Sequence, residues 1–117
     1  MELKPKFRVE YSNEAIEFLS SLPLQVRKKI GFNINKVANG VMDKTIFDKM
    51  EGTKDLWEFR TIYANTKYRL LAFWDTTSET IVIAANGFIK KTQKTPSKEK
   101  ERAEEIKKRY FDNKNKK

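Results

Sequence analysis

The hydrophobic positions of the first twenty residues predict a strand followed by a short helix. Apolar and polar residues alternate over residues 7–11, FRVEY, which is typical of a half-buried strand. Ser12 or Asn13 offers a helix N-cap, and Glu14 and Glu17 follow where acids suit the helix dipole. The apolar stripe of this helix comprises Ala15, Ile16, Leu19 and Leu22.

A second helix is predicted directly after the first. Pro23 fits its start, and apolar residues then recur at spacings of 4, 4 and 3 until Gly40 supplies a stop. These apolar residues are Val26, Ile30, Ile34 and Val37. The basic residues lie mainly off this stripe, on a solvated face, and are Arg27, Lys28, Lys29 and Lys36. The two helices therefore form a predicted helical hairpin.

The second half of the chain predicts three strands and a closing helix. Residues 41–55 show little periodicity and are interpreted as a connector. Aromatic and β-branched residues concentrate in residues 56–62, 68–74 and 80–89, separated by polar stretches of hairpin length, which predicts an antiparallel meander. A helix start at residues 95–97 is followed by the thin apolar stripe Ala103, Ile106 and Tyr110.

This order of elements predicts an α+β domain with a mostly antiparallel sheet of about four strands, an N-terminal helical hairpin and a C-terminal helix. We expect the helices to pack on one side of the sheet and the first strand to join it at an edge or beside the last strand. Residues 1–112 form one predicted domain, and residues 113–117 a frayed basic tail. With no membrane-spanning run and no apolar stretch in residues 1–6, a soluble cytoplasmic protein without membrane contact is expected.

The composition excludes most of the common catalytic sites. The 117 residues include no cysteine and no histidine, which rules out disulfides, thiolate nucleophiles, serine triads and the usual zinc sites. No cluster of metal ligands is visible, so neither a metal nor another cofactor is expected. Any catalysis must use Lys, Arg, Asp, Glu and Tyr.

The positive charge is concentrated at the end of the chain. Lys and Arg number 25 against 16 acids, and residues 90–117 alone hold 12 basic and 5 acidic residues. With a pI near 9.7, this distribution favours a phosphate-bearing partner. The alternative is an ordinary solvated tail, which is the better interpretation for residues 113–117.

Two arginines on neighbouring predicted strands are the first candidates for chemistry. Strand alternation places Glu58 and Arg60 on one face of LWEFRTI, and Arg69 beside apolar neighbours in YRLLAFW. The hairpin would bring the two arginines together, where they repel unless acids or a bound anion neutralise them. A phosphate site and neutralisation by Glu58 and Asp75 are about equally supported.

The segment 87–96, GFIKKTQKTP, places lysines at a junction between a strand and a helix. Lys90, Lys91 and Lys94 follow Phe88, and an aromatic side chain beside basic residues suits single-stranded nucleic acid. Core packing is the favoured alternative for Phe88, because strand aromatics are usually buried.

Taken together, LWEFR, YRLLAFW and ANGFIKKTQKTP followed by EKERAEEIKKRY resemble the phage-derived HigB-like branch of the RelE/HigB toxins, over nearly the whole chain. The resemblance implies a RelE-like fold and the toxin role in a type II toxin–antitoxin system. It also implies an mRNA endonuclease that usually requires the ribosome, and a cognate antitoxin that commonly carries a helix-turn-helix domain. Because no cluster of metal ligands is visible, we expect this cleavage to need no metal ion. The antitoxin would meet the basic C-terminal helix through an acidic segment.

The resemblance also suggests residue roles. Arg69 matches the phosphate-contacting arginine, and Arg60 the second basic strand position. The expected catalytic residues are Arg60, Arg69, Lys90, Lys91 and Glu58. The expected RNA-binding residues are Lys54, Phe88, Lys94, Lys98 and Arg102. The general base stays open between the crowded lysines and Glu58, because this chain lacks the histidine of some relatives and nothing near Tyr110 matches their motif.

Two other functions fit the same residues. A non-enzymatic module could use the arginines and lysines only to bind RNA or DNA phosphates. A degenerate toxin could act mainly as an antitoxin-binding protein, and the missing histidine keeps that interpretation open.

Overall fold

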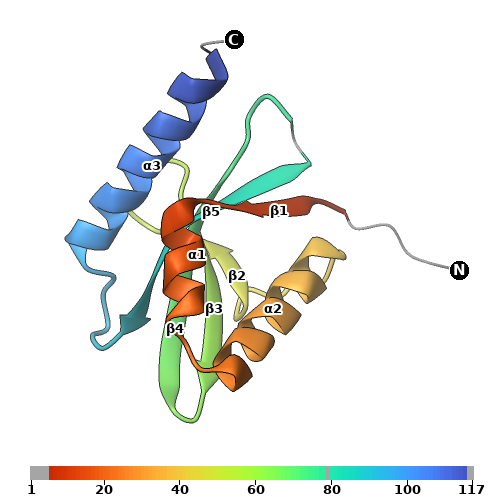
Figure 1. Cartoon of the computed structure of the whole chain (residues 1–117), viewed down its shortest axis with the longest axis vertical. Helices are drawn as coiled ribbons and strands as arrows, with labels where there is room; N and C mark the ends of the chain where they lie inside the picture. Colours follow the sequence, from red (N-terminus) through yellow and green to blue (C-terminus); the bar gives the residue numbers. More distant parts are fainter. Residues whose placement is uncertain (1–5, 79, 116–117) are drawn as a thin grey trace, which may run out of the picture.

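The structure is a computed structural model that describes residues 6–78 and 80–115 (Figure 1). Within these residues the elements are, in chain order, β1 Arg8–Tyr11, α1 Asn13–Ser20, α2 Leu24–Ala38, β2 Phe47–Lys49, β3 Trp57–Tyr63, β4 Thr66–Trp74, β5 Ile81–Lys90 and α3 Ser97–Asn115. Every element that the sequence pattern predicted is present. The positions of their ends differ from the predictions by a few residues.

The strands form one mostly antiparallel five-stranded sheet in the order β1-β5-β4-β3-β2. β1 runs parallel to β5, so it lies both at an edge and beside the last strand. β2 lies within the segment that we interpreted as a connector, and it pairs antiparallel with β3. The sequence predicted about four strands because a strand of three residues is too short to show a period.

Helices cover both faces of this sheet, which corrects the expectation that all helices lie on one side. α1 and α2 pack on one face through a core that includes Ala15, Val26, Ile30, Phe59 and Leu70. α3 packs on the other face through a core that includes Leu71, Phe73, Ile83, Ala103 and Ile106. The second face needs this cover because its own strand residues are apolar. α3 contacts β4 and β5, and the β3–β4 hairpin extends beyond it (Figure 1).

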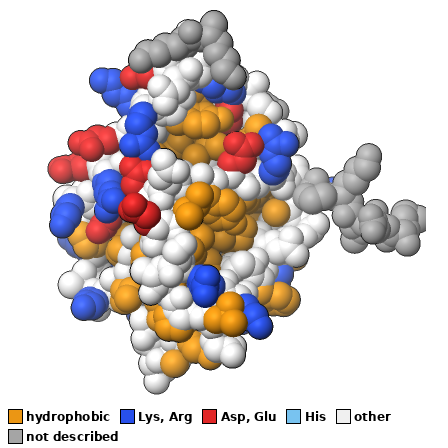
Figure 2. Space-filling model, in the orientation of Figure 1, with side chains coloured by type: hydrophobic (Ala, Val, Ile, Leu, Met, Phe, Trp, Pro, Cys, Tyr) orange, Lys and Arg blue, Asp and Glu red, His pale blue; other side chains and the backbone are white. Residues whose placement is uncertain are grey.

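An aromatic cluster packs against the core on the sheet face that α1 and α2 cover, here called the α1–α2 face. Phe7, Phe47 and Trp74 are half-buried, and the Phe7 ring centroid lies 6.3 Å from that of Phe47 and 5.0 Å from that of Trp74. Figure 2 shows hydrophobic side chains gathered in the middle of this face, between α1 and α2. The cluster connects β2 and β4 to the segment that leads into β1.

The register of the β3–β4 hairpin is set by a two-residue turn. Ala64 and Asn65 both have positive φ, 48° and 65°, as a type I′ turn requires at its two central positions. The polar stretch 64–67 thus contributes only two residues to the turn, and β4 begins at Thr66. This turn places Arg60 directly opposite Arg69.

A β-bulge in β5 determines which of its side chains face α3. Ala84 pairs with Ala72, but Asn86 pairs with Leu71, so Ala85 is one residue in excess. Before the bulge, Ala84 packs in the α1–α2 core, whereas Ala85 and Phe88 both belong to the α3 core. Without the bulge, strict alternation would turn Phe88 and the residues in phase with it to the opposite face.

Gly87 allows α1 to approach β5 closely. A Cβ at this position would lie 2.1 Å from Cδ2 of the Phe18 ring.

Gly87→Ala is therefore expected to lower the free energy of unfolding by about 1–3 kcal/mol, the usual cost of overpacking. Gly31→Ala in α2, where nothing lies within 4 Å, should instead stabilise by about 0.5–1 kcal/mol. Urea denaturation of both variants measures this; equal effects would contradict the close approach.

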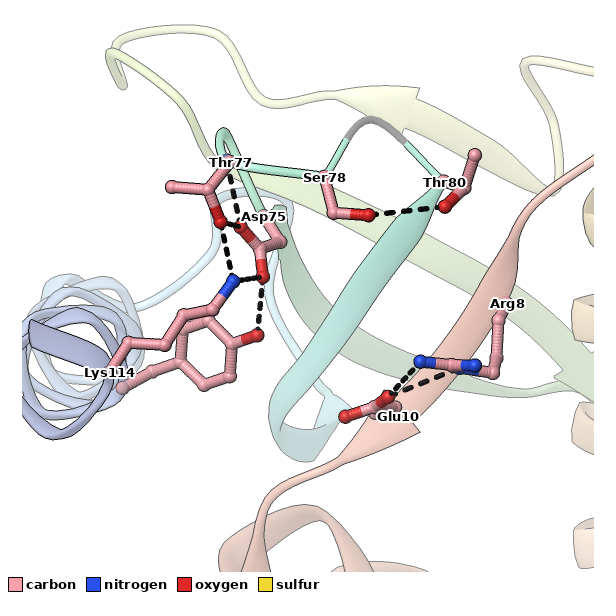
Figure 3. Close-up of polar contacts among 8 residues, drawn as sticks. Arg8, Glu10, Asp75, Thr77, Ser78, Thr80 and Lys114 are labelled. Atoms are coloured by element: carbon pink, nitrogen blue, oxygen red, sulfur yellow. Dashed lines mark hydrogen bonds and ion pairs between the residues drawn. The ribbon is translucent and has the colours of Figure 1, made fainter. Parts of the chain in front are cut away.

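The end of α3 is anchored to the β4–β5 loop through Asp75 (Figure 3). Asp75 is fully buried and accepts hydrogen bonds from Lys114, from the Tyr110 hydroxyl at 2.6 Å and from the Thr77 hydroxyl at 2.6 Å. Burial alone would raise the pKa of Asp75, but these hydrogen bonds outweigh it and lower the pKa. Residues 113–115 are thus helical rather than part of a frayed tail, and residues 116–117 lie outside the described residues.

None of the helices in the described part of the chain combines the length and apolar character needed to cross a membrane.

Candidate functional site

Arg60 and Arg69 lie side by side on the sheet face that carries α3. They form a directly opposed pair between β3 and β4, and the next strand places Phe88 opposite Arg69 in the same row. Opposed residues of a sheet point to the same face, so the two guanidinium groups converge as the sequence predicted.

Glu58 lies between the two arginines. Its Oε1 is 2.6 Å from Nε of Arg60 and 3.8 Å from Nε of Arg69. Arg60 also donates a hydrogen bond to the carbonyl of Lys44 at 3.2 Å. Glu58 therefore compensates part of the positive charge, as the structural interpretation of this pair expected. Asp75, the other predicted counter-charge, instead binds Lys114 at the far end of the sheet.

The two arginines differ in their access to solvent. The side chain of Arg60 is 34% exposed, whereas that of Arg69 is 9% exposed and donates a hydrogen bond to the Tyr68 carbonyl at 3.2 Å. Burial lowers the pKa of Arg69, Glu58 raises it and Arg60 lowers it, with a net lowering. A guanidinium stays protonated despite such a shift. Arg60 is therefore the more accessible of the two arginines to a ligand from solvent.

Three buried polar atoms of this face have no hydrogen-bond partner among the described residues. They are Oε2 of Glu58, Nε of Arg69 and Oδ1 of Asn86. Buried polar atoms are nearly always hydrogen-bonded, so these three atoms are the ones on this face that a water molecule or a ligand could satisfy.

Asn86 is a site residue that the sequence reasoning missed. It is 1% exposed, and its Nδ2 donates hydrogen bonds to the carbonyl and to Oε1 of Glu99, both at 3.2 Å. These bonds join β5 to the first turn of α3 and close the loop that carries Lys91 and Lys94. An asparagine within a strand of β-branched and aromatic residues was the signal available in the sequence.

Lys90 joins the arginine pair from β5. It pairs in register with Lys67 of β4, one row beyond Arg69. Burial lowers the pKa of Lys90, and Arg69, Arg60 and Lys67 lower it further, while Glu58 raises it. The positive neighbours are the arginines and Lys67 rather than Lys91 and Lys94, which the sequence had suggested.

The remaining predicted residues do not join this cluster. Phe88 is 8% exposed and packs in the α3 core, so it is a core residue and not a surface for base stacking. Lys91 and Lys94 are exposed on the loop after β5. Lys54 lies beside α3 in a groove that also contains Glu101 and Glu104.

Lys98 and Arg102 are exposed on α3. Arg102 lies near Glu14 of α1, whose pKa it helps to lower. Tyr110 is held by Asp75, and burial together with this hydrogen bond raises its pKa. Tyr110 lies near the C-terminal end of α3, whereas Asn86 contacts Glu99 in its first turn. Among the described residues, no group of three or more carboxylates suited to a metal ion occurs.

Comparison with known proteins identifies one family model. The model described as phage-derived protein Gp49-like (DUF891) matches residues 17–108. No curated protein matches the chain significantly.

Several solved structures share the fold. The intact Escherichia coli RelBE toxin–antitoxin complex matches with a TM-score of 0.57 and 14% identity, over 74% of this chain and 99% of that chain. The isolated E. coli RelE toxin matches with a TM-score of 0.55 and 13% identity, over 82% and 97%. An archaeal RelE–RelB complex from Pyrococcus horikoshii OT3 matches with a TM-score of 0.50 and 18% identity, over 72% and 94%. At such identities these matches show the fold alone.

Proposed function

Because the chain belongs to the phage-derived Gp49-like family and has the fold of RelE toxins, we propose that it is the toxin of a type II toxin–antitoxin pair and cuts messenger RNA on the ribosome. A fold by itself does not determine an activity, so the proposal depends on the site. The observation that carries it is the convergence of Arg60 and Arg69 around a single carboxylate on the sheet face that carries α3.

The charge of this cluster suits an RNA phosphate. Arg60, Arg69, Lys67 and Lys90 contribute four positive charges, and Glu58 is the carboxylate that faces them. Such an excess of like charge is unfavourable unless an anion binds. A guanidinium stays charged and can hold two phosphate oxygens at once, which favours the two arginines as phosphate ligands.

The cleavage step requires neither water nor a metal ion. The ribose 2′-oxygen forms a bond to the adjacent phosphorus while the bond from phosphorus to the 5′-oxygen breaks. The products are a 2′,3′-cyclic phosphate and a 5′-hydroxyl, whose oxygen takes up a proton from solvent as it leaves. Arg60 and Arg69 would stabilise the additional charge on the phosphate oxygens in the transition state.

Lys90 is the proposed proton acceptor for the 2′-hydroxyl. Its lowered pKa gives a larger neutral fraction near pH 7 than an ordinary lysine has. Glu58 is the alternative base, since one of its oxygens has no hydrogen-bond partner in the described structure. Its other oxygen is held by Arg60 at 2.6 Å, so Glu58 is the second choice. Lys91, Lys94, Lys98, Arg102 and Lys54 remain proposed contacts to RNA outside the reacting phosphate.

The proposed partners are a cognate antitoxin, commonly of the helix-turn-helix type, the ribosome and its message, all in the cytoplasm. The RelE matches include complexes with RelB antitoxins, which supports an antitoxin partner. We propose that the antitoxin binds the basic α3 through an acidic segment. Three basic residues of α3 are already paired with acids of this chain: Lys107 with Asp55, Arg109 with Glu14 and Lys114 with Asp75.

The experiment is incubation of the purified chain with ribosomes that carry a defined message. We expect discrete cuts whose upstream fragments end in a 2′,3′-cyclic phosphate, and cutting should persist with protein freed of metal by EDTA and dialysis. Binding without cuts would favour a non-enzymatic RNA- or DNA-binding module. Neither binding nor cuts, with tight binding of an antitoxin, would favour a degenerate toxin.

A further inference from the structure

We propose that Lys67 and Lys91 form a second phosphate subsite, which holds the RNA phosphate next to the one that is cleaved. This inference rests on the proposed RNA cleavage. It adds a residue, Lys67, that the sequence pattern did not single out, and it places Lys91 in the groove that Lys67 also lines.

The sheet register positions Lys67 for this role. It lies two residues before Arg69 on β4, so both side chains point to the same face. Two residues of a strand span about 7 Å. The cations therefore form two successive rows along the face, Arg60 with Arg69 and then Lys67 with Lys90.

A groove continues from the second row toward the hairpin turn. Its lining comes from the start of β4 and from the residues around the end of β5: Asn65, Thr66, Lys67, Ile89, Lys90, Lys91, Thr92 and Gln93. None of these lining residues is acidic, and several carry hydroxyl or amide groups that can donate hydrogen bonds. Such a groove is suited to a polyanion rather than to an apolar or basic ligand.

The charges of the two rows are close enough to act on one another. Arg69, Arg60 and Lys67 all contribute to the lowered pKa of Lys90, and Glu58 opposes them. Glu58 lies next to the arginines, where Arg60 already binds it at 2.6 Å. In the part of the chain that the structure describes, no acidic residue lines the groove beside the lysine row. A single phosphate bound at the arginines would leave the positive charge of the lysine row uncompensated. An RNA strand, in contrast, brings one phosphate to each row.

Lysine is also a suitable residue type for holding the phosphate next to the cleaved one. The ammonium of lysine is a flexible point charge, which can hold a phosphate without demanding a fixed geometry. Contacts to phosphates position a strand but do not read its sequence. We therefore expect the subsite to place the strand for cleavage and to leave the choice of cutting site unchanged.

The test pairs a protein change with an RNA change. Lys67→Gln is compared with Lys29→Gln, an exposed lysine of α2 outside the site. Each is assayed under single turnover with ribosome-bound message that carries one methylphosphonate linkage, which lacks the negative charge of a phosphate, on either side of the cleaved position. Loss of one charge-assisted contact is expected to slow cleavage about tenfold, whether it is removed from the protein or from the RNA.

The combined change decides the result. If Lys67 binds the neighbouring phosphate, Lys67→Gln should cause little further loss on the methylphosphonate message, because the contact is already absent. Lys29→Gln should cleave like the unchanged protein. Losses that multiply, or equal rates for the Lys67 and Lys29 variants, would overturn the subsite while leaving the proposed cleavage intact. Failure of the unchanged protein to cut the all-phosphate message would overturn the proposed function itself.

Discussion

Arg69→Ala is expected to abolish growth arrest when the chain is expressed in bacteria. The variant loses a guanidinium that would stabilise the transition-state phosphate, and loss of one such contact typically slows catalysis about 10²- to 10³-fold. The fold should survive, because Glu58 keeps its 2.6 Å contact with Arg60. Growth curves after induction, with circular dichroism of the purified variant, measure the two effects separately.

Two further variants make this result specific. Arg69→Lys keeps the charge but loses the planar fork, so intermediate toxicity is expected. Arg27→Ala removes an exposed arginine of α2 and should remain fully toxic. A folded Arg69→Ala variant that still arrests growth would contradict the assignment of Arg69 to the reacting phosphate.

Lys90→Ala is expected to slow cleavage about 10²-fold or more, the usual contribution of a positioned acid or base. The pH dependence of the cleavage rate distinguishes a role of Lys90 as a base from a role as a positive charge only. Burial and the neighbouring cations lower the pKa of Lys90, so its neutral fraction grows as the pH rises through that pKa. The rate of the unchanged protein should therefore rise with pH and level off above that pKa.

Lys90→Arg is the matched variant, because arginine keeps the positive charge but cannot lose its proton. Both Lys90 variants should lack the rise in rate with pH, which single-turnover rates at a series of pH values would show. A rise that persists in both variants, and disappears in Glu58→Gln, would instead identify Glu58 as the base.

The order of elements could be predicted because long periodic segments carry strong signals. The α2 stripe of Val26, Ile30, Ile34 and Val37 is buried as the spacing predicted. β2 could not be predicted, since its three residues gain their structure from pairing with β3. The side on which α3 packs could not be predicted either, because a thin apolar stripe does not specify which sheet face it covers.

In the candidate site, too, some features could be predicted from the sequence and others could not. The convergence of Arg60 and Arg69 follows from strand alternation and a tight hairpin, both visible in the sequence. The participation of Lys90 depends on the bulge at Ala85, because strict alternation from Ile83 and Ala85 would turn Lys90 to the α1–α2 face. A bulge leaves no clear mark on the pattern. The side of the sheet on which Asn86 and Phe88 lie, and the pairing of Lys90 with Lys67, follow from the same shift.

The most direct test is the single-turnover cleavage rate of Arg60→Ala, Arg69→Ala and the double variant on ribosome-bound message, with affinity for the programmed ribosome measured alongside. If both guanidinium groups hold one phosphate, each single variant should lose rate while affinity changes little. The double variant should then lose less than the product of the two single losses. Unchanged rates, or losses confined to affinity, would contradict a catalytic pair of arginines.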